Sequence, residues 1–457
     1  MNLLVKDKCF YKKMAAIAIP ISLQSMITIG VNMTDTVMVG KLGETSLSAT
    51  ALANQFVNIY QICCMGIAMG ASVLTSRFWG MQDITSLKKT ITLMLRLCIG
   101  LAVLFMLPTI LIPQLLMRMY TNDSAVIAQG VQYFKWMVYC YFLQGMTMTC
   151  TIVLRSVGQV NFPLFTSIGS FFVNILFNYM FIFGKLGVPR MEVEGAGVGT
   201  LIARVFEFSL ICGYFLFVDR KIGYRLKDLR MKCNSLIKDY VSISIPVFVS
   251  DSLLALGTSA VAMVMGRIGT GFVSANSITV VTQQLTTVII QGICHASCIM
   301  TGHTLGHGER EKAQQQAWTF LILGLVVGIL GGGLIKVLSR PIIGLYNITP
   351  ETAQIAGELM DAIAFIVIFQ SMNSILTKGV LRGGGDTKFL MVADIIFLWA
   401  ASLPLGILAG LVWHLDAFWI YVFLKIDQIC KSIWCVFRLR SGKWIKTFSK
   451  EKMNHAQ

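Results

Sequence analysis

One carboxylate, that of Asp35, lies near the far end of the first long apolar stretch of the chain. A charged side chain at the centre of a membrane-spanning helix costs about 2.5–3.5 kcal/mol, so an acid here needs a function or a partner. Such a carboxylate can bind a proton, or it can bind Na+ if further oxygen ligands join it, because hard cations prefer oxygen. Asn32 lies one helical turn earlier on the same face.

Further oxygen ligands stand in two later apolar stretches. Asn174 and Asn178 are four residues apart, which places both amides on one face of a helix. Thr200 lies in the next apolar stretch and adds a hydroxyl. With Asp35 these oxygens could complete a cage for a monovalent cation. The pattern therefore indicates a cation-binding site, and we expect no catalytic residues.

A second cluster imitates the spacing of a zinc finger: Cys294, Cys298, His303 and His307. It spans the end of a predicted membrane helix and the loop that follows, a segment with no reason to fold around a metal. Most other cysteines lie in apolar runs, where cysteine behaves as a small hydrophobic residue. We expect no metal site and no cofactor other than the coupling ion.

The elements that must position these residues are membrane-spanning helices. Of the 457 residues, 55% are hydrophobic and 13% are charged, whereas a soluble protein carries about 25% charged residues. The mean hydropathy is +0.71. Apolar stretches of about 20 residues predict an all-α membrane protein with about twelve transmembrane helices. We place them at 14–38, 48–73, 91–112, 130–153, 163–184, 195–217, 241–265, 276–300, 316–337, 355–379, 389–411 and 417–437.

The net charge of +16 could suggest a nucleic-acid partner, but the placement of the charges argues against one. Lysine and arginine concentrate at both ends and in alternate loops, above all between residues 219 and 238. By the positive-inside rule this pattern predicts a multi-pass protein of the cell membrane with both termini cytoplasmic. Its basic faces would meet anionic lipid headgroups rather than nucleic acid.

The chain repeats its own design. Ile19-Pro20 returns as Ile245-Pro246, and Val153-Leu154-Arg155 returns as Val380-Leu381-Arg382, but Val261 stands where the first copy has Asp35. Two parallel repeats of six helices, an N-lobe and a C-lobe, are typical of secondary transporters. The predicted domains are an N-lobe at 1–218, a basic cytoplasmic linker at 219–240, a C-lobe at 241–437 and a basic cytoplasmic tail at 438–457.

Over nearly its whole length the chain resembles the multidrug and toxin extrusion (MATE) family. The resemblance rests on the order, spacing and duplication of four motifs: Asp35–Gly40, Asn174–Asn178, Gly195–Thr200 and the paired Val-Leu-Arg segments. It implies a V-shaped pair of six-helix lobes that exports organic, often cationic, compounds. It also implies that inward movement of Na+ or H+ drives this export.

The resemblance places the N-lobe cation site on Asp35, Asn174, position 178 and Thr200. Some family members have an aspartate where Asn178 stands, so the site here keeps one formal charge, which balances one Na+ or one proton. The family's first helix is thought to bend at the position of Pro20. A proline removes one backbone hydrogen bond and makes a hinge plausible, but Pro246 repeats it without the acid, so hinge and static kink both stay open.

Acids in the second half offer a further cation or substrate site. Other branches of the family place a cation site in the C-lobe, and Asp386, and more loosely Asp251, match its positions. The remaining charged residues of the helices have a structural interpretation. We expect Arg204 to pair with Glu207 and Asp427 to pair with Lys431, and we expect the two Val-Leu-Arg arginines, Arg155 and Arg382, to fix loops at the membrane surface.

The predicted function is that of a secondary antiporter and not of an enzyme. No GxxxxGK[ST] phosphate loop occurs, so ATP is not the obvious energy source. A monomer would export small organic compounds, hydrophobic cations above all, in exchange for Na+ or H+ by alternating access. One alternative is a lipid-linked saccharide flippase of the wider superfamily, although the spans offer few basic residues beyond Arg96, Lys135 and Arg204. The other is an integral-membrane lipid-modifying enzyme, for which only the region of His303 and His307 qualifies.

Overall fold

The computed structural model describes residues 4–185, 187–344 and 348–447, and within these ranges every regular element is a helix. The first half holds α1 Lys8–Gly40, α2 Glu44–Gly80, α3 Ile84–Leu111, α4 Pro113–Arg118, α5 Ser124–Ser156, α6 Asn161–Phe183, α7 Glu192–Gly213, η1 Tyr214–Val218 and η2 Leu226–Arg230. The second half holds α8 Asn234–Ile268, α9 Thr270–Gly306, α10 Arg310–Ile343, α11 Pro350–Ser374, η3 Ile375–Leu381, α12 Thr387–Asp394, η4 Ile395–Ser402, α13 Leu403–Ile407, η5 Leu408–Val412, α14 Ala417–Leu424 and α15 Ile426–Arg440. The all-α fold class is confirmed.

Eleven helices in the described part of the chain are long and apolar enough to cross a membrane. They correspond to the first eleven predicted spans. The twelfth, predicted at 417–437, is split into α14 and α15 at Lys425, whose backbone leaves the helical region (φ −121°, ψ 16°). The break frees the carbonyl oxygen of Leu424, which accepts a hydrogen bond from Ser402 Oγ at 2.5 Å. Each half is therefore too short to span on its own.

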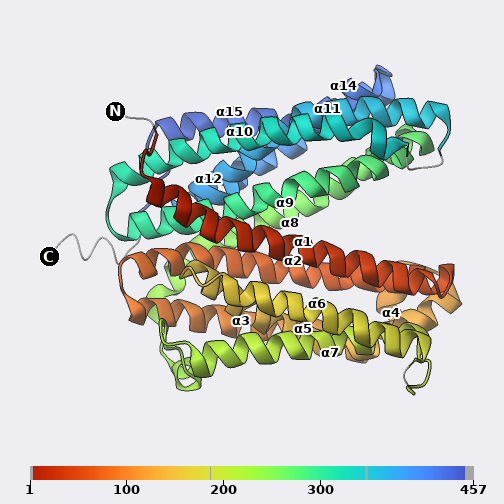
Figure 1. Ribbon diagram of the computed structural model, residues 1–457, viewed down its shortest axis with the longest axis horizontal. Coiled ribbons are helices and arrows are strands. Elements are labelled where there is room, and N and C mark those ends of the chain that lie inside the picture. The colour runs from red at the N-terminus through yellow and green to blue at the C-terminus, as the bar shows by residue number, and fades with distance from the viewer. Residues whose placement is uncertain (1–3, 186, 345–347, 448–457) are drawn as a thin grey trace. The chain divides into compact units, whose positions relative to one another are not determined.

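The chain divides into two compact units. Unit 1 comprises residues up to Ser22, Ser76–Met81 and residues from Ile245 onward, and unit 2 comprises Leu23–Thr75 and Gln82–Ser244. In unit 2, α6 and α7 run side by side, and so do α10 and α11 in unit 1 (Figure 1). The helices α1, α2 and α8 each contribute residues to both units.

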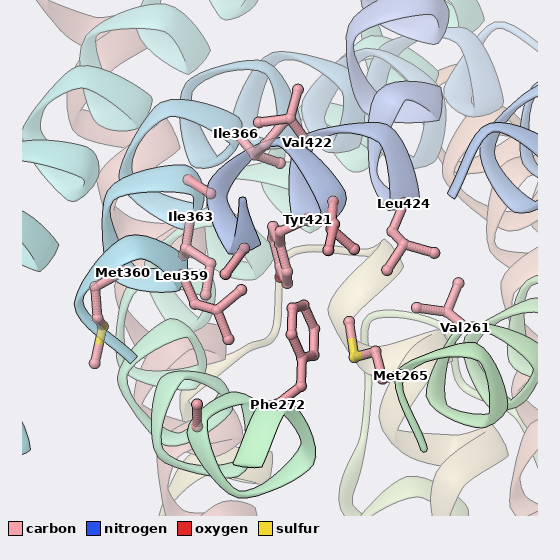
Figure 2. Close-up of a cluster of buried hydrophobic side chains, with 14 of the residues drawn as sticks. Val261, Met265, Phe272, Leu359, Met360, Ile363, Ile366, Tyr421, Val422 and Leu424 are labelled. Atoms are coloured by element: carbon pink, nitrogen blue, oxygen red, sulfur yellow. The ribbon is translucent and has the colours of Figure 1, made fainter. Parts of the chain in front are cut away.

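The core of unit 1 gathers around α11. Leu359, Ile363 and Ile366 of α11 face Tyr421 of α14, and Phe272 of α9 reaches the same cluster (Figure 2). Leu359 is fully buried, and the other four are at least 96% buried. Burial of each such side chain contributes roughly 1.5–3 kcal/mol. This core holds α14 against α11 although the last span is interrupted.

The basic linker is folded onto unit 2. Lys88 of α3 forms a 3.0 Å ion pair with Asp228 and donates to the carbonyl oxygen of Gly223 at 2.6 Å. Burial would raise the pKa of Asp228, but the hydrogen bonds from Lys88 and from the backbone N–H of Arg225 outweigh it and lower this pKa. The pair is thus kept charged at neutral pH, and η2 stays attached to the N-terminal part of α3.

The segment after α15 is also attached. Trp444 is fully buried, and its Nε1 donates to Gln314 Oε1 at 2.7 Å. A side chain at Gly384 would meet the Trp444 ring at 2.3 Å, so glycine is required for this contact. Arg77 Nη1 donates to the carbonyl oxygen of Lys446 at 2.5 Å. The predicted basic tail therefore begins as an ordered part of unit 1, and its residues 448–457 lie outside the described residues.

Candidate functional site

The site in unit 2 is built where α1 meets α6. Asn178 Nδ2 donates to Asp35 Oδ1 at 2.6 Å and lies 3.3 Å from Asn174 Oδ1. Asn174 and Asn178 are 2% and 0% exposed, and Asp35 is half-buried. The helical spacing of the two asparagines thus brings both amides to the acid, as their positions in the sequence predict. The three side chains gather one formal negative charge and several oxygen acceptors in one place.

The close approach of α7 completes the packing of Asn178. A side chain at Gly199 would lie 2.1 Å from Asn178 Oδ1, so the absence of a Cβ at this position makes room for the amide. Asn178 Oδ1 is buried and has no hydrogen-bond partner in the described part of the chain. A buried acceptor without a partner costs about 1–3 kcal/mol. Thr200 follows Gly199 and is half-buried.

Two predicted site residues are less closely tied to the carboxylate. Thr200 makes no hydrogen bond to Asp35 among the contacts of the described residues, although its neighbour Gly199 packs against Asn178. Asn32 is exposed on α1, where its carbonyl oxygen accepts from Thr36 Oγ1 at 2.8 Å. The structure thus brings Asp35, Asn174 and Asn178 together and leaves Asn32 apart.

Arg204 and Tyr133 interact with the carboxylate of Asp35, although the sequence analysis did not place either residue at the site. Arg204 Nη1 lies 2.7 Å from Glu207 Oε2, which confirms the predicted pair. Arg204 also interacts electrostatically with Asp35, and so does Tyr133 of α5. Tyr133 donates to Asn54 Oδ1 at 3.2 Å, which ties α5 to α2. The influence of Arg204 is visible only in the folded structure, because Arg204 in α7 and Asp35 in α1 are far apart in the sequence.

Pro20, the predicted hinge, lies inside α1, which is helical on both sides of it. The division between the two units falls between Ser22 and Leu23, two residues beyond this proline. In α8 the division falls between Ser244 and Ile245, next to Pro246. Each proline therefore lies where its helix passes from one unit to the other, at a point where one backbone hydrogen bond is missing.

The C-lobe acids belong to separate ion pairs. Asp251 Oδ1 lies 3.1 Å from Arg382 Nη2. Asp386 is 3% exposed and pairs with Arg438 Nε at 2.7 Å and with Lys446 Nζ at 3.3 Å. Cation binding at either acid would have to displace a basic side chain. Asp35 differs from both because its hydrogen-bond partner is a neutral amide.

A buried ionic triad links α12 and α15 in unit 1. Lys431 Nζ lies 3.0 Å from Asp427 Oδ2, which confirms the predicted pair, and 3.1 Å from Asp394 Oδ1. Ser250 Oγ donates to Asp394. Lys431 and Asp427 are each 2% exposed. The participation of Asp394 was not predicted, because Asp394 lies in α12, 37 residues before Lys431, and an i,i+4 pattern reports only neighbours within one helix.

Replacing Lys431 with methionine is expected to destabilise the protein strongly. The change leaves two carboxylates buried without their cation, and breaking a buried pair in this way costs about 3–5 kcal/mol. Thermal unfolding of the purified protein in detergent measures the effect. Lys336→Met is the matched control, because its pair with Asp361 is exposed (side chains 63% and 42% exposed). Equal unfolding temperatures for the two variants would contradict the assignment.

The cysteine and histidine cluster is dispersed. Cys294 Sγ contacts the carbonyl oxygen of Ser374 at 3.4 Å, and Cys298 is buried. Within residues 4–185, 187–344 and 348–447, no three His, Cys, Asp or Glu side chains lie close enough to hold a metal ion. The unit 2 site is therefore the arrangement with the clearest binding chemistry.

Comparison with known proteins agrees with this fold. The chain is 24% identical to the uncharacterized transporter YisQ of Bacillus subtilis, covering 96% of each chain. It is 24% identical to the probable multidrug resistance protein NorM of Thermotoga maritima, covering 95% of this chain and 93% of that one. A solved structure of the Vibrio cholerae MATE transporter VcmN in the bent form superposes with a TM-score of 0.85 at 17% identity, covering 96% and 99% of the two chains. A MOP superfamily transporter from Pyrococcus furiosus gives a TM-score of 0.83 at 19% identity, covering 95% and 97%.

The long apolar helices of the described residues define the class of a multi-pass membrane protein. The sequence model of the MatE family matches residues 20–180 and 246–429, one segment in each half of the chain. The chain therefore belongs to the MatE family, the multidrug and toxin extrusion transporters.

Proposed function

We propose that this transporter exports small organic compounds, hydrophobic cations above all, in exchange for one Na+ or one proton that binds at Asp35. The observation that carries the proposal is the environment of this carboxylate. Asp35 lies in a candidate span and is hydrogen-bonded by Asn178, and Arg204, the base that acts on it, is engaged by Glu207. The names of relatives such as NorM of Thermotoga maritima support drug export.

The chemistry of the site favours a monovalent cation. One carboxylate carries one charge, which a proton or Na+ balances, and the amide oxygens of Asn174 and Asn178 are hard ligands of the kind that Na+ prefers. The proton would instead need only the carboxylate. The oxygen-rich site is suited to both ions, so a transport measurement has to identify the coupling ion.

Binding can be coupled to export if the cation and the substrate favour different states of the transporter. An ion shifts such an equilibrium only by its difference in affinity for the two states. The site joins α1 to α6, and α1 passes from unit 1 to unit 2 just beyond Pro20. We infer that cation binding at Asp35 biases α1, that Pro20 absorbs the change as a hinge, and that access to the substrate site alternates in consequence.

The contacts of the basic residues in the spans favour export of organic cations over transport of a lipid-linked pyrophosphate. A flippase would need a strongly cationic cavity, but Lys135 pairs with Glu194 at 3.3 Å, and Arg96 donates to the carbonyl oxygens of Leu229 and Met231. Arg204 is engaged by Glu207. The three basic residues that the sequence offers for such a cavity are thus already bound to protein groups.

Efflux from proteoliposomes tests the proposal. Vesicles containing the purified protein and loaded with ethidium, a fluorescent organic cation, are exposed to an imposed Na+ gradient or an imposed H+ gradient. We expect one of the two gradients to drive efflux, and that gradient identifies the coupling ion. If neither gradient drives export of any cation tested, the proposal is wrong. Flipping of a fluorescent lipid by the same vesicles would then favour the flippase.

A further inference from the structure

The two halves of the chain treat an equivalent arginine differently. Each half carries a Val-Leu-Arg motif, which ends at Arg155 in the first and at Arg382 in the second. Arg382 forms an ion pair with Asp251 of α8 at 3.1 Å. Arg155 instead donates through Nη2 to the amide oxygen of Gln24 in α1. Where the C-lobe has an aspartate, unit 2 has a neutral amide.

No carboxylate replaces the missing counter-charge. Gln24 is 8% exposed, and its Nε2 donates to Ser167 Oγ at 2.8 Å, so this neighbour is neutral as well. Among the described residues, no acid is hydrogen-bonded or ion-paired to Arg155. Arginine cannot lose its proton in a protein, so the positive charge stays.

The position of Arg155 in its helix does not compensate for this difference. Arg155 lies in the last turn of α5, where the helix dipole favours a cation by about 0.3–1 kcal/mol. Arg382 likewise follows directly after η3, so both arginines share this benefit. Desolvation of a buried ion costs several kcal/mol. Of the two arginines, therefore, only Arg382 has a full counter-charge among the described residues.

The guanidinium of Arg155 retains donors for a ligand. Its Nε is buried and has no hydrogen-bond partner in the described part of the chain. The residue as a whole is half-buried, so part of the side chain is accessible. The planar guanidinium matches the geometry of a carboxylate or a phosphate, which it can bind through two parallel hydrogen bonds.

We propose that Arg155, together with Gln24, forms an oxyanion-binding site in unit 2, and that a carboxylate or phosphate group supplies the charge that Asp251 supplies to Arg382. This site is separate from cation binding at Asp35. The oxyanion can belong to an exported compound or to a phospholipid headgroup, and both share the chemistry that the guanidinium recognises.

Thermal unfolding of the purified full-length protein in neutral detergent tests the site. The probe is inorganic phosphate, compared with chloride at equal Na+ concentration and equal ionic strength. Wild type is expected to be stabilised by phosphate beyond chloride. Gln24→Glu keeps the size of the side chain and supplies the missing carboxylate, so we expect a higher unfolding temperature without phosphate and an apparent affinity for phosphate at least about tenfold weaker.

Two further variants make the result decisive. Arg155→Gln removes the guanidinium and is expected to lose the phosphate response even if its basal stability changes. Lys227→Gln changes the net charge by the same amount at an exposed position of the linker and is expected to keep the response. No phosphate effect in wild type, or an unchanged effect in both Gln24→Glu and Arg155→Gln, would overturn the proposal.

Two other probes distinguish the source of the oxyanion. Phosphatidylglycerol and phosphatidylcholine are compared in mixed micelles, and benzoate is compared with neutral benzamide. Stabilisation by phosphatidylglycerol alone assigns the site to a lipid headgroup, whereas stabilisation by benzoate alone assigns it to the acidic group of a transported compound. In either case the stabilisation by the probe must be lost in Gln24→Glu. Stabilisation that persists in this variant would count against binding at Arg155.

Discussion

Asp35→Asn is expected to abolish export of organic cations driven by the coupling ion. The variant keeps the size of the side chain and can still accept from Asn178, which lies 2.6 Å from the carboxylate in the wild type. It loses the one formal charge of the site. Hydrogen bonds to charged groups contribute about 1.5–3 kcal/mol, which corresponds to about a 10- to 100-fold loss of cation affinity. Efflux of ethidium from proteoliposomes under the effective gradient measures the result.

The matched control is Asp361→Asn. Asp361 is also an acid in a candidate span, but it is exposed and paired with Lys336. We expect this variant to retain efflux within about twofold, because Asp361 belongs to unit 1, whereas the residues of the Asp35 site belong to unit 2. If Asp35→Asn and wild type export ethidium equally, Asp35 is structural, and the acids of the C-lobe become the site to test.

The second large effect is expected for Gly199→Ala. A Cβ at this position would lie 2.1 Å from Asn178 Oδ1 and 2.9 Å from the Asn178 backbone nitrogen, so either α7 or the amide must move. Overpacking of this kind costs about 1–3 kcal/mol. Displacement of Asn178 removes the donor to Asp35, so we expect a reduced apparent affinity for the coupling ion. The measurement is the dependence of efflux on the concentration of that ion.

Gly213→Ala, at the end of the same helix, controls for the change of residue type. A Cβ there would have no atom within 4 Å, so we expect wild-type efflux and wild-type ion dependence. A Gly199→Ala variant that folds and shows an unaltered ion dependence would refute a role for the packing of α7 against Asn178.

Much of the candidate site could be predicted from sequence because its signals are local. An acid inside an apolar helix is conspicuous, and the spacing of Asn174 and Asn178 defines a shared helix face. The influence of Arg204 on Asp35 could not be predicted, because the two residues are far apart in the sequence and only the folded structure brings their charges near each other. For the same reason the i,i+4 pair of Asp427 and Lys431 was foreseen while Asp394 was not.

The fold shows the same limit. Hydropathy identifies the apolar stretches correctly, but it does not detect the break at Lys425. The break depends on the local backbone conformation and on Ser402, whose hydroxyl donates a hydrogen bond to the freed carbonyl oxygen of Leu424. The basic composition after Arg438 predicts a solvated tail. Burial of Trp444 depends on Gln314 and Gly384, which are distant in sequence and invisible to composition.

The membership of the first 22 residues in unit 1 has a consequence for biogenesis. Val5 donates its backbone N–H to Thr319 Oγ1 at 3.0 Å, and the ring of Phe10 lies 5.3 Å from that of Phe320. The ribosome makes these early residues several hundred positions before their partners. Contacts with such large sequence separation slow folding, because the chain between them must be ordered first. The segment that holds Val5 and Phe10 therefore reaches its final packing only after the second half of the chain has been synthesised.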